Sequence, residues 1–281
     1  MKTIFEKSQI EKAHAFKKLH ERDKLFIIPN AWDAGSAKIL ETLGFEAVAT
    51  TSAGLAFSLA KPDAMRSVTR KENLANANAI AATTSLPTSV DLENGYGDDP
   101  EICGETILLA AKNGSVGCTL EDATGLEDRP IYDFDLSVRR IKAAAKAAHS
   151  LPFPFMLTAR AENYLYGKPD LNDTVRRLQA YADAGADVLY APGIKTKNEI
   201  ETIVKAVSPR PVNFLFGTTD ENITLDDLQK IGVKRVSVGS AFARVAYSSF
   251  INAATELRDR GTFEFSRNAI SYGSLNKMFM Q

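Results

Sequence analysis

The stretch Ala184-Gly185-Ala186-Asp187-Val188-Leu189-Tyr190-Ala191 decides the fold of this 281-residue chain, because it joins a helix to a strand by the shortest route. Residues 171–184 have the apolar spacing of an amphipathic helix, and residues 188–191 form the short apolar run of a buried strand. Gly185 is suited to end the helix, since glycine adopts the left-handed backbone of a helix C-terminus without strain. This order is typical of a parallel βα unit.

The same order recurs along almost the whole chain. Further glycines that are expected to end a helix lie at Leu43-Gly44-Phe45, Asn113-Gly114 and Ile231-Gly232-Val233. The expected strands are residues 25–29, 47–51, 88–92, 117–121, 155–160, 188–191, 212–216 and 235–239. The expected helices between them are residues 34–43, 70–84, 100–113, 135–148, 171–184, 197–206 and 225–231.

Eight strands that alternate with helices predict an α/β fold, a (β/α)8 TIM-type barrel. A doubly wound open sheet is the alternative, but no Gly-x-Gly-x-x-Gly follows the first strand, which weakens a dinucleotide-binding interpretation. Residues 8–22 predict an extra helix ahead of the barrel, and residues 242–260 and 266–279 would close the chain. Residues 1–281 contain no low-complexity linker and are expected to form a single domain.

Composition limits the functions open to the chain. A net charge of −1 and a pI near 6.4 give no general attraction to nucleic acid or to an anionic membrane. We see no apolar run near the ~20 residues of a membrane span and no secretory signal in the first seven residues. Cys103 and Cys118 lack metal-type spacing, which favours a cytoplasmic location. The histidines, His14, His20 and His149, fall in helical sequence, so a histidine base is not expected.

The third expected strand runs into Asp91-Leu92-Glu93-Asn94-Gly95-Tyr96-Gly97. Carboxylates at i and i+2 of an extended segment point to the same side, and the glycines then turn the chain sharply. Paired carboxylates without Cys or His beside them suit Mg²⁺, with Mn²⁺ as a substitute, better than zinc. The simpler interpretation is a polar strand end before a turn, because Asp and Gly end strands routinely.

Neighbouring strands also end in polar residues, and the carboxyl ends of barrel strands form one rim where active sites gather. Asp91, Glu93 and Glu121 can hold a divalent cation directly or through its waters. The Arg160 guanidinium suits a carboxylate, although a structural salt bridge to Glu121 or Glu162 is the alternative. The remaining candidates for substrate binding also follow the ends of strands: Trp32, Ser52, Ala53, Gly54, Glu162 and Asn213. A cation, an arginine and N–H groups together suit a 2-oxo acid, whose cleavage builds up an enolate.

From about Leu25 to its C-terminus the chain resembles the isocitrate lyase/phosphoenolpyruvate mutase superfamily, in particular a branch called carboxyphosphonoenolpyruvate phosphonomutase-like. The motifs that carry the resemblance are Asn30-Ala31-Trp32-Asp33-Ala34-Gly35-Ser36-Ala37, Thr51-Ser52-Ala53-Gly54-Leu55, Pro62-Asp63, Asp91-Leu92-Glu93-Asn94-Gly95-Tyr96-Gly97, Leu120-Glu121-Asp122 and Ala159-Arg160-Ala161-Glu162.

The resemblance implies a (β/α)8 fold with Mg²⁺ held through Asp91, Glu93 and Glu121. It also implies a pyruvate-like group bound by Ser52, Gly54 and Arg160. Asp63 matches an aspartate that lies beside the metal and the reacting group in the family. In related barrels the terminal helix packs on a neighbouring subunit. The many apolar residues after position 262 then predict a homodimer or homotetramer.

The loop after the fourth strand departs from the family. Isocitrate-type lyases carry a catalytic cysteine there, whereas residues 123–130 contain no cysteine, lysine or histidine. Cys118 is three residues before Glu121 on a strand, so it is expected to face away from the carboxylates. The loop also lacks the lysine and asparagine of phosphonoenolpyruvate-forming mutases. We therefore expect little methylisocitrate cleavage and favour a reaction that needs no strong acid, with water or Tyr96 protonating the enolate.

Three interpretations remain open. The first is an Mg²⁺-dependent enzyme that cleaves or rearranges a C–C or P–C bond beside a 2-oxo acid carbonyl, by lyase, hydrolase or mutase action. The second is a barrel that binds a small keto acid without turnover. The third is a phosphate-binding barrel enzyme, for which Phe216-Gly217-Thr218-Thr219 and Val238-Gly239-Ser240 are only a faint match.

Overall fold

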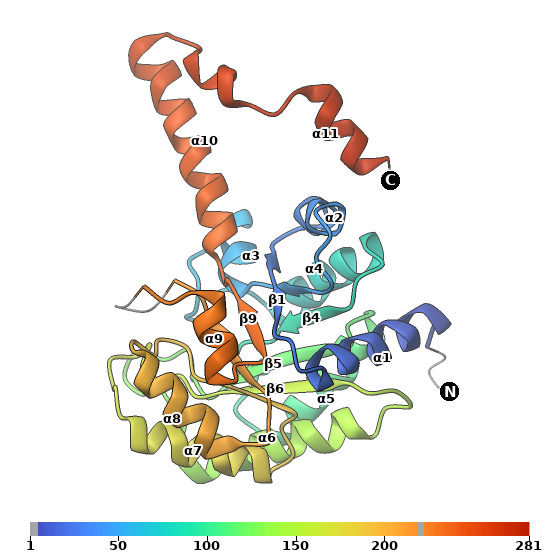
Figure 1. Cartoon of the computed structure of the whole chain (residues 1–281), viewed down its shortest axis with the longest axis vertical. Coiled ribbons are helices and arrows are strands. Elements are labelled where there is room, and N and C mark those ends of the chain that lie inside the picture. The colour runs from blue at the N-terminus through green and yellow to red at the C-terminus, as the bar shows by residue number, and fades with distance from the viewer. Residues whose placement is uncertain (1–4, 218–221, 281) are drawn as a thin grey trace.

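The computed structural model describes residues 5–217 and 222–280. Its centre is one sheet of parallel strands with the order β1-β9-β8-β7-β6-β5-β4-β3-β2 (Figure 1). The strands are β1 (Phe26–Ile28), β2 (Asn30–Ala31), β3 (Val48–Thr50), β4 (Thr88–Asp91), β5 (Gly117–Glu121), β6 (Met156–Arg160), β7 (Val188–Tyr190), β8 (Val212–Leu215) and β9 (Arg235–Ser237). The predicted TIM-type barrel is confirmed.

The first predicted strand is split in two by Pro29. Proline has no backbone N–H and cannot donate to a strand ladder. β1 before it pairs with β9, and β2 after it pairs with β3. The two edges of the sheet therefore belong to one short stretch of chain, which nearly closes the barrel.

Helices follow the strands, as the helix-ending glycines predicted. They are α1 (Lys7–Glu21), α2 (Ala34–Thr42), α3 (Ser52–Ser58), α4 (Arg70–Thr83), α5 (Pro100–Lys112), α6 (Phe134–His149), α7 (Leu171–Asp183), α8 (Lys197–Val207), α9 (Leu225–Ile231), α10 (Ala241–Arg260) and α11 (Tyr272–Phe279), with a 3-10 turn at Glu264–Asn268. α9, for example, ends at Gly232, whose φ is 97°. The short helix α3 was not predicted, because its seven residues carry no clear apolar period.

The helix α1 covers the N-terminal end of the barrel. Phe16 and His20 are buried and contact each other edge to face, with ring centroids 4.7 Å apart. Each also meets the ring of Phe26, the first residue of β1. A Cβ on Gly117, the first residue of β5, would lie 2.8 Å from the Phe16 ring. This end is therefore filled by side chains, and the opposite end is left for a ligand.

The C-terminal segment leaves the barrel. α10 projects away from the strands, and α11 then returns beside α2 (Figure 1). The Thr42 hydroxyl donates to the Met278 carbonyl at 3.4 Å. On α10, Val245, Phe250 and Ile251 are 64%, 69% and 58% exposed. None of the helices within the described ranges is long and apolar enough to cross a membrane.

Candidate active site

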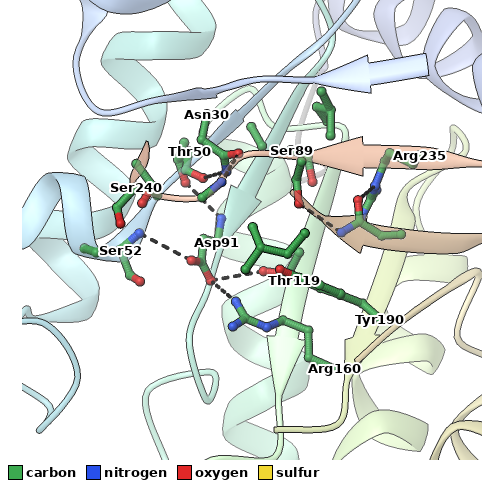
Figure 2. A pocket seen from close by; sticks show the side chains of 18 of the residues that line it. Asn30, Thr50, Ser52, Ser89, Asp91, Thr119, Arg160, Tyr190, Arg235 and Ser240 are labelled. Carbon is green, nitrogen blue, oxygen red and sulfur yellow. Dashed lines mark hydrogen bonds and ion pairs between the residues drawn. The ribbon is translucent and has the colours of Figure 1, made fainter. Parts of the chain in front are cut away.

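A cavity of about 200 Å³ opens among the strands and the loops that follow them (Figure 2). Active sites of barrel enzymes lie at this C-terminal face. Its polar lining residues are Asn30, Thr50, Thr51, Ser52, Asp63, Ser89, Asp91, Thr119, Arg160, Tyr190, Asn213, Arg235, Ser237 and Ser240. The cavity is thus lined mainly by hydroxyl, amide and charged groups.

Asp91, the last residue of β4, receives several hydrogen bonds. The Thr119 hydroxyl donates to Oδ1 at 3.0 Å, and the backbone N–H of Glu93 donates to the same oxygen at 3.3 Å. The N–H of Ser52 donates to Oδ2 at 3.3 Å. Arg160 Nη1 lies 3.4 Å from Oδ1. Four donors, of which Figure 2 draws the contacts of Ser52, Thr119 and Arg160, therefore fix this carboxylate in the cavity wall.

The turn after Asp91 has an unusual backbone. Glu93 and Tyr96 have φ values of 48° and 65°, which non-glycine residues rarely adopt. Gly95 has φ of 80°, and a Cβ there would lie 2.9 Å from Leu120. The turn places Glu93 next to Tyr96, whose hydroxyl donates to Glu93 Oε1 at 3.1 Å. Strain of this kind is concentrated at functional sites.

Arg160, the last residue of β6, is held by three carboxylates. Its Nε lies 2.7 Å from Glu162, its Nη2 lies 3.2 Å from Glu121, and its Nη1 lies 3.4 Å from Asp91. The salt bridge that the sequence left as an alternative is therefore present. A guanidinium has five N–H groups; three meet these carboxylates, which leaves two without a carboxylate partner.

The same carboxylates crowd one another. Burial, together with the nearby charge of Asp91, raises the pKa of Glu93 to about 7. Burial also raises the pKa of Glu121 well above its usual range, and Arg160 only partly offsets this. The rim thus carries more negative charge than Arg160 can neutralise, which is the condition that a bound cation relieves.

The geometry fits a cation held mainly through water. In the described residues, no three His, Cys, Asp or Glu side chains converge closely enough to hold a metal together. Asp91 lines the cavity, whereas Glu93 and Glu121 are not among its lining residues. Mg²⁺ keeps several waters and needs few direct carboxylates. The donor set therefore suits direct binding by Asp91, with Glu93 and Glu121 reached through water.

Thr51 and the first two residues of α3, Ser52 and Ala53, line the cavity after β3. Gly54 lies behind them, because its N–H donates to Thr51 Oγ1 at 3.3 Å. A Cβ on Gly54 would lie 2.7 Å from the Cβ of Trp32, which is half-buried and also outside the lining. Of the motif at residues 51–55, only Thr51, Ser52 and Ala53 therefore line the cavity.

Asp63 stands at the open mouth of the cavity. Asp63 as a whole residue is exposed to solvent, but its carboxyl group is largely surrounded by protein atoms. The carboxyl group hydrogen-bonds the Ser52 side chain. This burial raises the pKa of Asp63; the charge of Asp91 adds to the rise, whereas the Ala64 N–H and Ser52 oppose it. Asp63 is therefore a titratable group beside Ser52 and Asp91.

The predicted site residues fall into two groups. Those that line the cavity are Ser52, Ala53, Asp63, Asp91, Arg160 and Asn213. Those that lie outside its lining are Trp32, Gly54, Glu93, Tyr96, Glu121 and Glu162. Of the second group, Glu162 is 2% exposed and accepts from Arg160 Nε, so it positions the arginine.

Sequence reasoning missed several lining residues on the strands themselves. Ser89 and Thr119 precede Asp91 and Glu121 by two positions. The period of two along a strand, extended inward from the predicted carboxylates, points to both of them. Arg235 was missed because it starts a strand rather than ending one.

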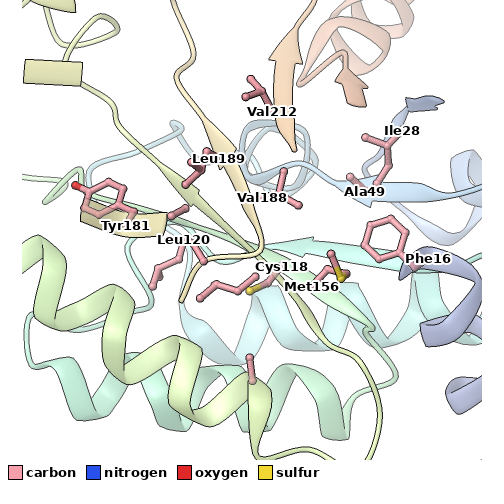
Figure 3. Packing of buried hydrophobic residues seen from close by; sticks show 14 of the residues in the cluster. Phe16, Ile28, Ala49, Cys118, Leu120, Met156, Tyr181, Val188, Leu189 and Val212 are labelled. Atoms are coloured by element: carbon pink, nitrogen blue, oxygen red, sulfur yellow. The ribbon is translucent and has the colours of Figure 1, made fainter. Parts of the chain in front are cut away.

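The loop after β5 is held in place without a cysteine. Its ends form an isolated bridge between Ala123 and Ile131, and Arg66 Nε donates to the Thr124 carbonyl at 2.8 Å. Cys118 lies in the apolar core with Leu120 and Met156 (Figure 3). Burial raises its thiol pKa well above the usual range. The prediction that Cys118 faces away from the carboxylates is confirmed.

The two segments that weakly match a phosphate-binding loop, residues 216–219 and 238–240, lie only partly within the described residues. Thr218 and Thr219 lie outside them. Gly217 has a left-handed backbone, with φ of 92°, and Gly239 lines the cavity.

Comparisons with known proteins agree on one family. The family model described as phosphoenolpyruvate phosphomutase matches residues 16–258. A crystal structure from Burkholderia cenocepacia J2315, provisionally designated a lyase/mutase, is 52% identical, with a TM-score of 0.94 and 98% of each chain covered. The structure of an oxaloacetate acetylhydrolase with its product oxalate is 26% identical, with a TM-score of 0.85, and covers 97% of this chain and 94% of that one. A probable 2-methylisocitrate lyase 1 from Corynebacterium glutamicum is 28% identical over 89% of this chain and 83% of its own.

Proposed function

Because the chain belongs to the phosphoenolpyruvate phosphomutase family, we propose that it is an Mg²⁺-dependent lyase that cleaves the C3–C4 bond of a short 2-oxo acid, one carbon away from the C2 carbonyl. Decarboxylation of oxaloacetate is the simplest reaction of this kind. Relatives named as a lyase and as an acetylhydrolase support cleavage of such bonds. The observation that carries the proposal is the shared cavity of Asp91, Arg160 and Ser52, in a chain whose neighbouring loop holds no cysteine acid.

Arg160 binds the substrate carboxylate in this proposal. Its two N–H groups that remain free of Asp91, Glu121 and Glu162 can both donate to one carboxylate. The three acidic partners hold the guanidinium at a fixed position, so little side-chain freedom is lost when substrate binds. The same partners weaken the net attraction for an anion, which makes a nearby cation necessary for tight binding.

The bond that breaks in oxaloacetate is the one between C3 and C4. Its electron pair moves toward C2, CO₂ leaves, and the negative charge collects on the carbonyl oxygen as an enolate. A bound Mg²⁺ supplies the positive charge that stabilises this enolate. Ser52 and Ala53 border the space where that oxygen would lie.

The enolate must then receive a proton at C3. Tyr96 is poorly placed to give it, because its hydroxyl donates to Glu93 and the residue lies outside the cavity lining. Asp63 lies at the mouth of the cavity and contacts Ser52. We therefore favour a water molecule next to Asp63 as the proton source.

Cleavage of methylisocitrate requires a general acid in the site. Its departing carboxylate-bearing fragment needs an acid, and residues 123–130 provide no cysteine, lysine or histidine. General acid help is typically worth about 10²–10⁴-fold. Methylisocitrate turnover is therefore expected to be slower than oxaloacetate turnover by about this factor.

A panel of substrates tests the proposal. Purified protein is assayed with oxaloacetate, phosphonopyruvate, methylisocitrate and 4-hydroxy-2-oxo acids, with Mg²⁺ and after chelation. We expect Mg²⁺-dependent release of CO₂ and pyruvate from oxaloacetate. Release of phosphate from phosphonopyruvate would shift the assignment to P–C cleavage. Ligand binding without turnover of any compound would favour a keto-acid-binding barrel.

We also propose that the chain forms a homodimer or homotetramer through α10. Val245, Phe250 and Ile251 on this helix are more than half exposed. A helix that projects from the barrel with large apolar side chains in water is unfavourable for a monomer. α11 contacts α2 of its own chain, but Tyr272 and Phe279 on α11 are still 85% and 45% exposed, so the terminal helix adds to the apolar surface of α10.

A further inference from the structure

A second arginine lies on the floor of the cavity. Arg235, the first residue of β9, is 2% exposed, yet it lines the cavity. Its Nε donates to Asn213 Oδ1 at 2.7 Å, and its Nη2 donates to the Thr158 hydroxyl at 2.9 Å. Its Nη1 lies 3.4 Å from His20 Nε2. The guanidinium is thus held by three neutral groups.

Arg235 differs from Arg160 in having no acidic partner. No ion pair in the described part of the chain joins Arg235 to a carboxylate, whereas Arg160 has three. Burial lowers the pKa of Arg235 to about 10, so the group is charged at neutral pH. A buried charge without a counter-charge is costly. Three of its five N–H groups are used, which leaves two that can meet an anion.

The arginine lies deeper in the barrel than the predicted metal site. Its partner Thr158 is two residues before Arg160 on β6, which is about 6–7 Å along a strand. Thr119, which hydrogen-bonds Asp91, is paired in register with Thr158. In Figure 2, Ser89 and Thr119 lie between Arg235 and the Asp91–Arg160 pair. The cavity therefore runs from an acidic rim, past hydroxyl groups, to a cationic floor.

We propose that Arg235, positioned by Asn213 and Thr158, forms a second anion subsite that receives the far carboxylate of a dianionic 2-oxo acid. The inference rests on the proposed function, since it places the 2-oxo acid head at Arg160 and Asp91. The hydroxyls of Ser89 and Ser237 line the path between the two ends. The floor would thereby select substrates with two anionic groups over those with an apolar tail.

Two probes that both carry a carboxylate on a 2-oxo carbon but differ at the far end separate the subsites. 2-Oxobutyrate ends in a methyl group, and 3,3-difluorooxaloacetate ends in a carboxylate. Their affinities for the full-length protein with Mg²⁺ are measured by calorimetry. We expect the dianion to bind more tightly to wild type. Arg235→Gln should weaken the dianion about 10–100-fold, the loss typical of a charged hydrogen bond, and leave 2-oxobutyrate unchanged. Arg235→Lys should keep part of the preference.

A second variant, Asn213→Asp, keeps the subsite testable if Arg235→Gln does not fold. It places a carboxylate against Arg235 Nε with almost no change of shape. The arginine is then neutralised within the protein, and the dianion should again lose about 10–100-fold in affinity. Equal losses for both probes in these variants, or no loss for either, would overturn the subsite. If wild type binds 2-oxobutyrate and the dianion equally well, the subsite fails and the proposed function stands; if it binds neither probe, both fail.

Discussion

His20 offers a quantitative test of the barrel floor. The side chain is 4% exposed on α1, and its Nδ1 lies 2.8 Å from the Phe16 carbonyl. A carbonyl can only accept, so Nδ1 carries the proton and Nε2 is free to accept from Arg235. Protonation of Nε2 would set two cations against each other. Burial, together with the charge of Arg235, accordingly lowers the pKa of His20 to about 3.

The sign of the effect on stability follows from the unfolded state. Unfolded His20 has a pKa of 6.5 and takes up a proton below that pH, whereas folded His20 stays neutral down to about pH 3. Acid therefore favours unfolding across this window. Between pH 7 and pH 5 the cost is about 2 kcal/mol of unfolding free energy.

The assay compares the pH dependence of urea unfolding in wild type and His20→Gln. The amide of glutamine can accept from Arg235 but does not titrate. Wild type should lose about 2 kcal/mol more than the variant between pH 7 and pH 5. His14→Gln, at an exposed position of the same helix, is the control and should follow wild type. Parallel profiles for wild type and His20→Gln would refute the neutral, Arg235-facing histidine.

Four further predictions concern the site and the assembly. Asp91→Asn should weaken Mg²⁺ binding at least about tenfold in calorimetry, because the variant loses a carboxylate that lines the cavity; undiminished binding would remove the metal proposal. Arg160→Lys should raise KM about 10–100-fold, whereas Asp63→Asn should mainly lower kcat. If steady-state kinetics show the reverse, Asp63 binds the substrate and Arg160 acts on the reacting group. Asp122→Asn should cost about 3 kcal/mol in urea unfolding, because this buried carboxylate accepts from Tyr181 and Arg177 at 2.6 and 3.1 Å; a loss below about 0.5 kcal/mol would show that the network is weak. Phe250→Asp should convert an oligomer to a monomer in sedimentation, and a wild type that is already monomeric would defeat the assembly proposal.

The order and type of the barrel elements could be predicted because each βα unit carries local signals. A glycine after a helix and an apolar run after the glycine fix both elements, as Gly232 and β9 illustrate. The split at Pro29 could not be foreseen as a closure point, because it depends on which distant strands pair on either side. α3 was missed because it is too short to show a period.

The residues at the C-terminal rim of the barrel could be predicted, but the residues deeper in the cavity could not. Asp91 and Arg160 end strands, and strand ends meet at one face in any parallel barrel. Whether Glu121 would bind a cation or Arg160 depends on side-chain distances, and the structure places it 3.2 Å from the arginine. Arg235 is the first residue of its strand, so a search for functional residues at the C-terminal ends of strands does not find it.

The central claim is that the Asp91–Arg160 cavity holds a divalent cation and an enolate-like ligand together. Oxalate tests it directly, because its two coplanar carboxylates match the shape and charge of pyruvate enolate. Oxalate is titrated into the protein with Mg²⁺ and after chelation, with a blank titration into Mg²⁺ buffer. We predict binding that requires Mg²⁺ and that Asp91→Asn abolishes. Oxalate binding of equal strength with and without Mg²⁺ would contradict the account.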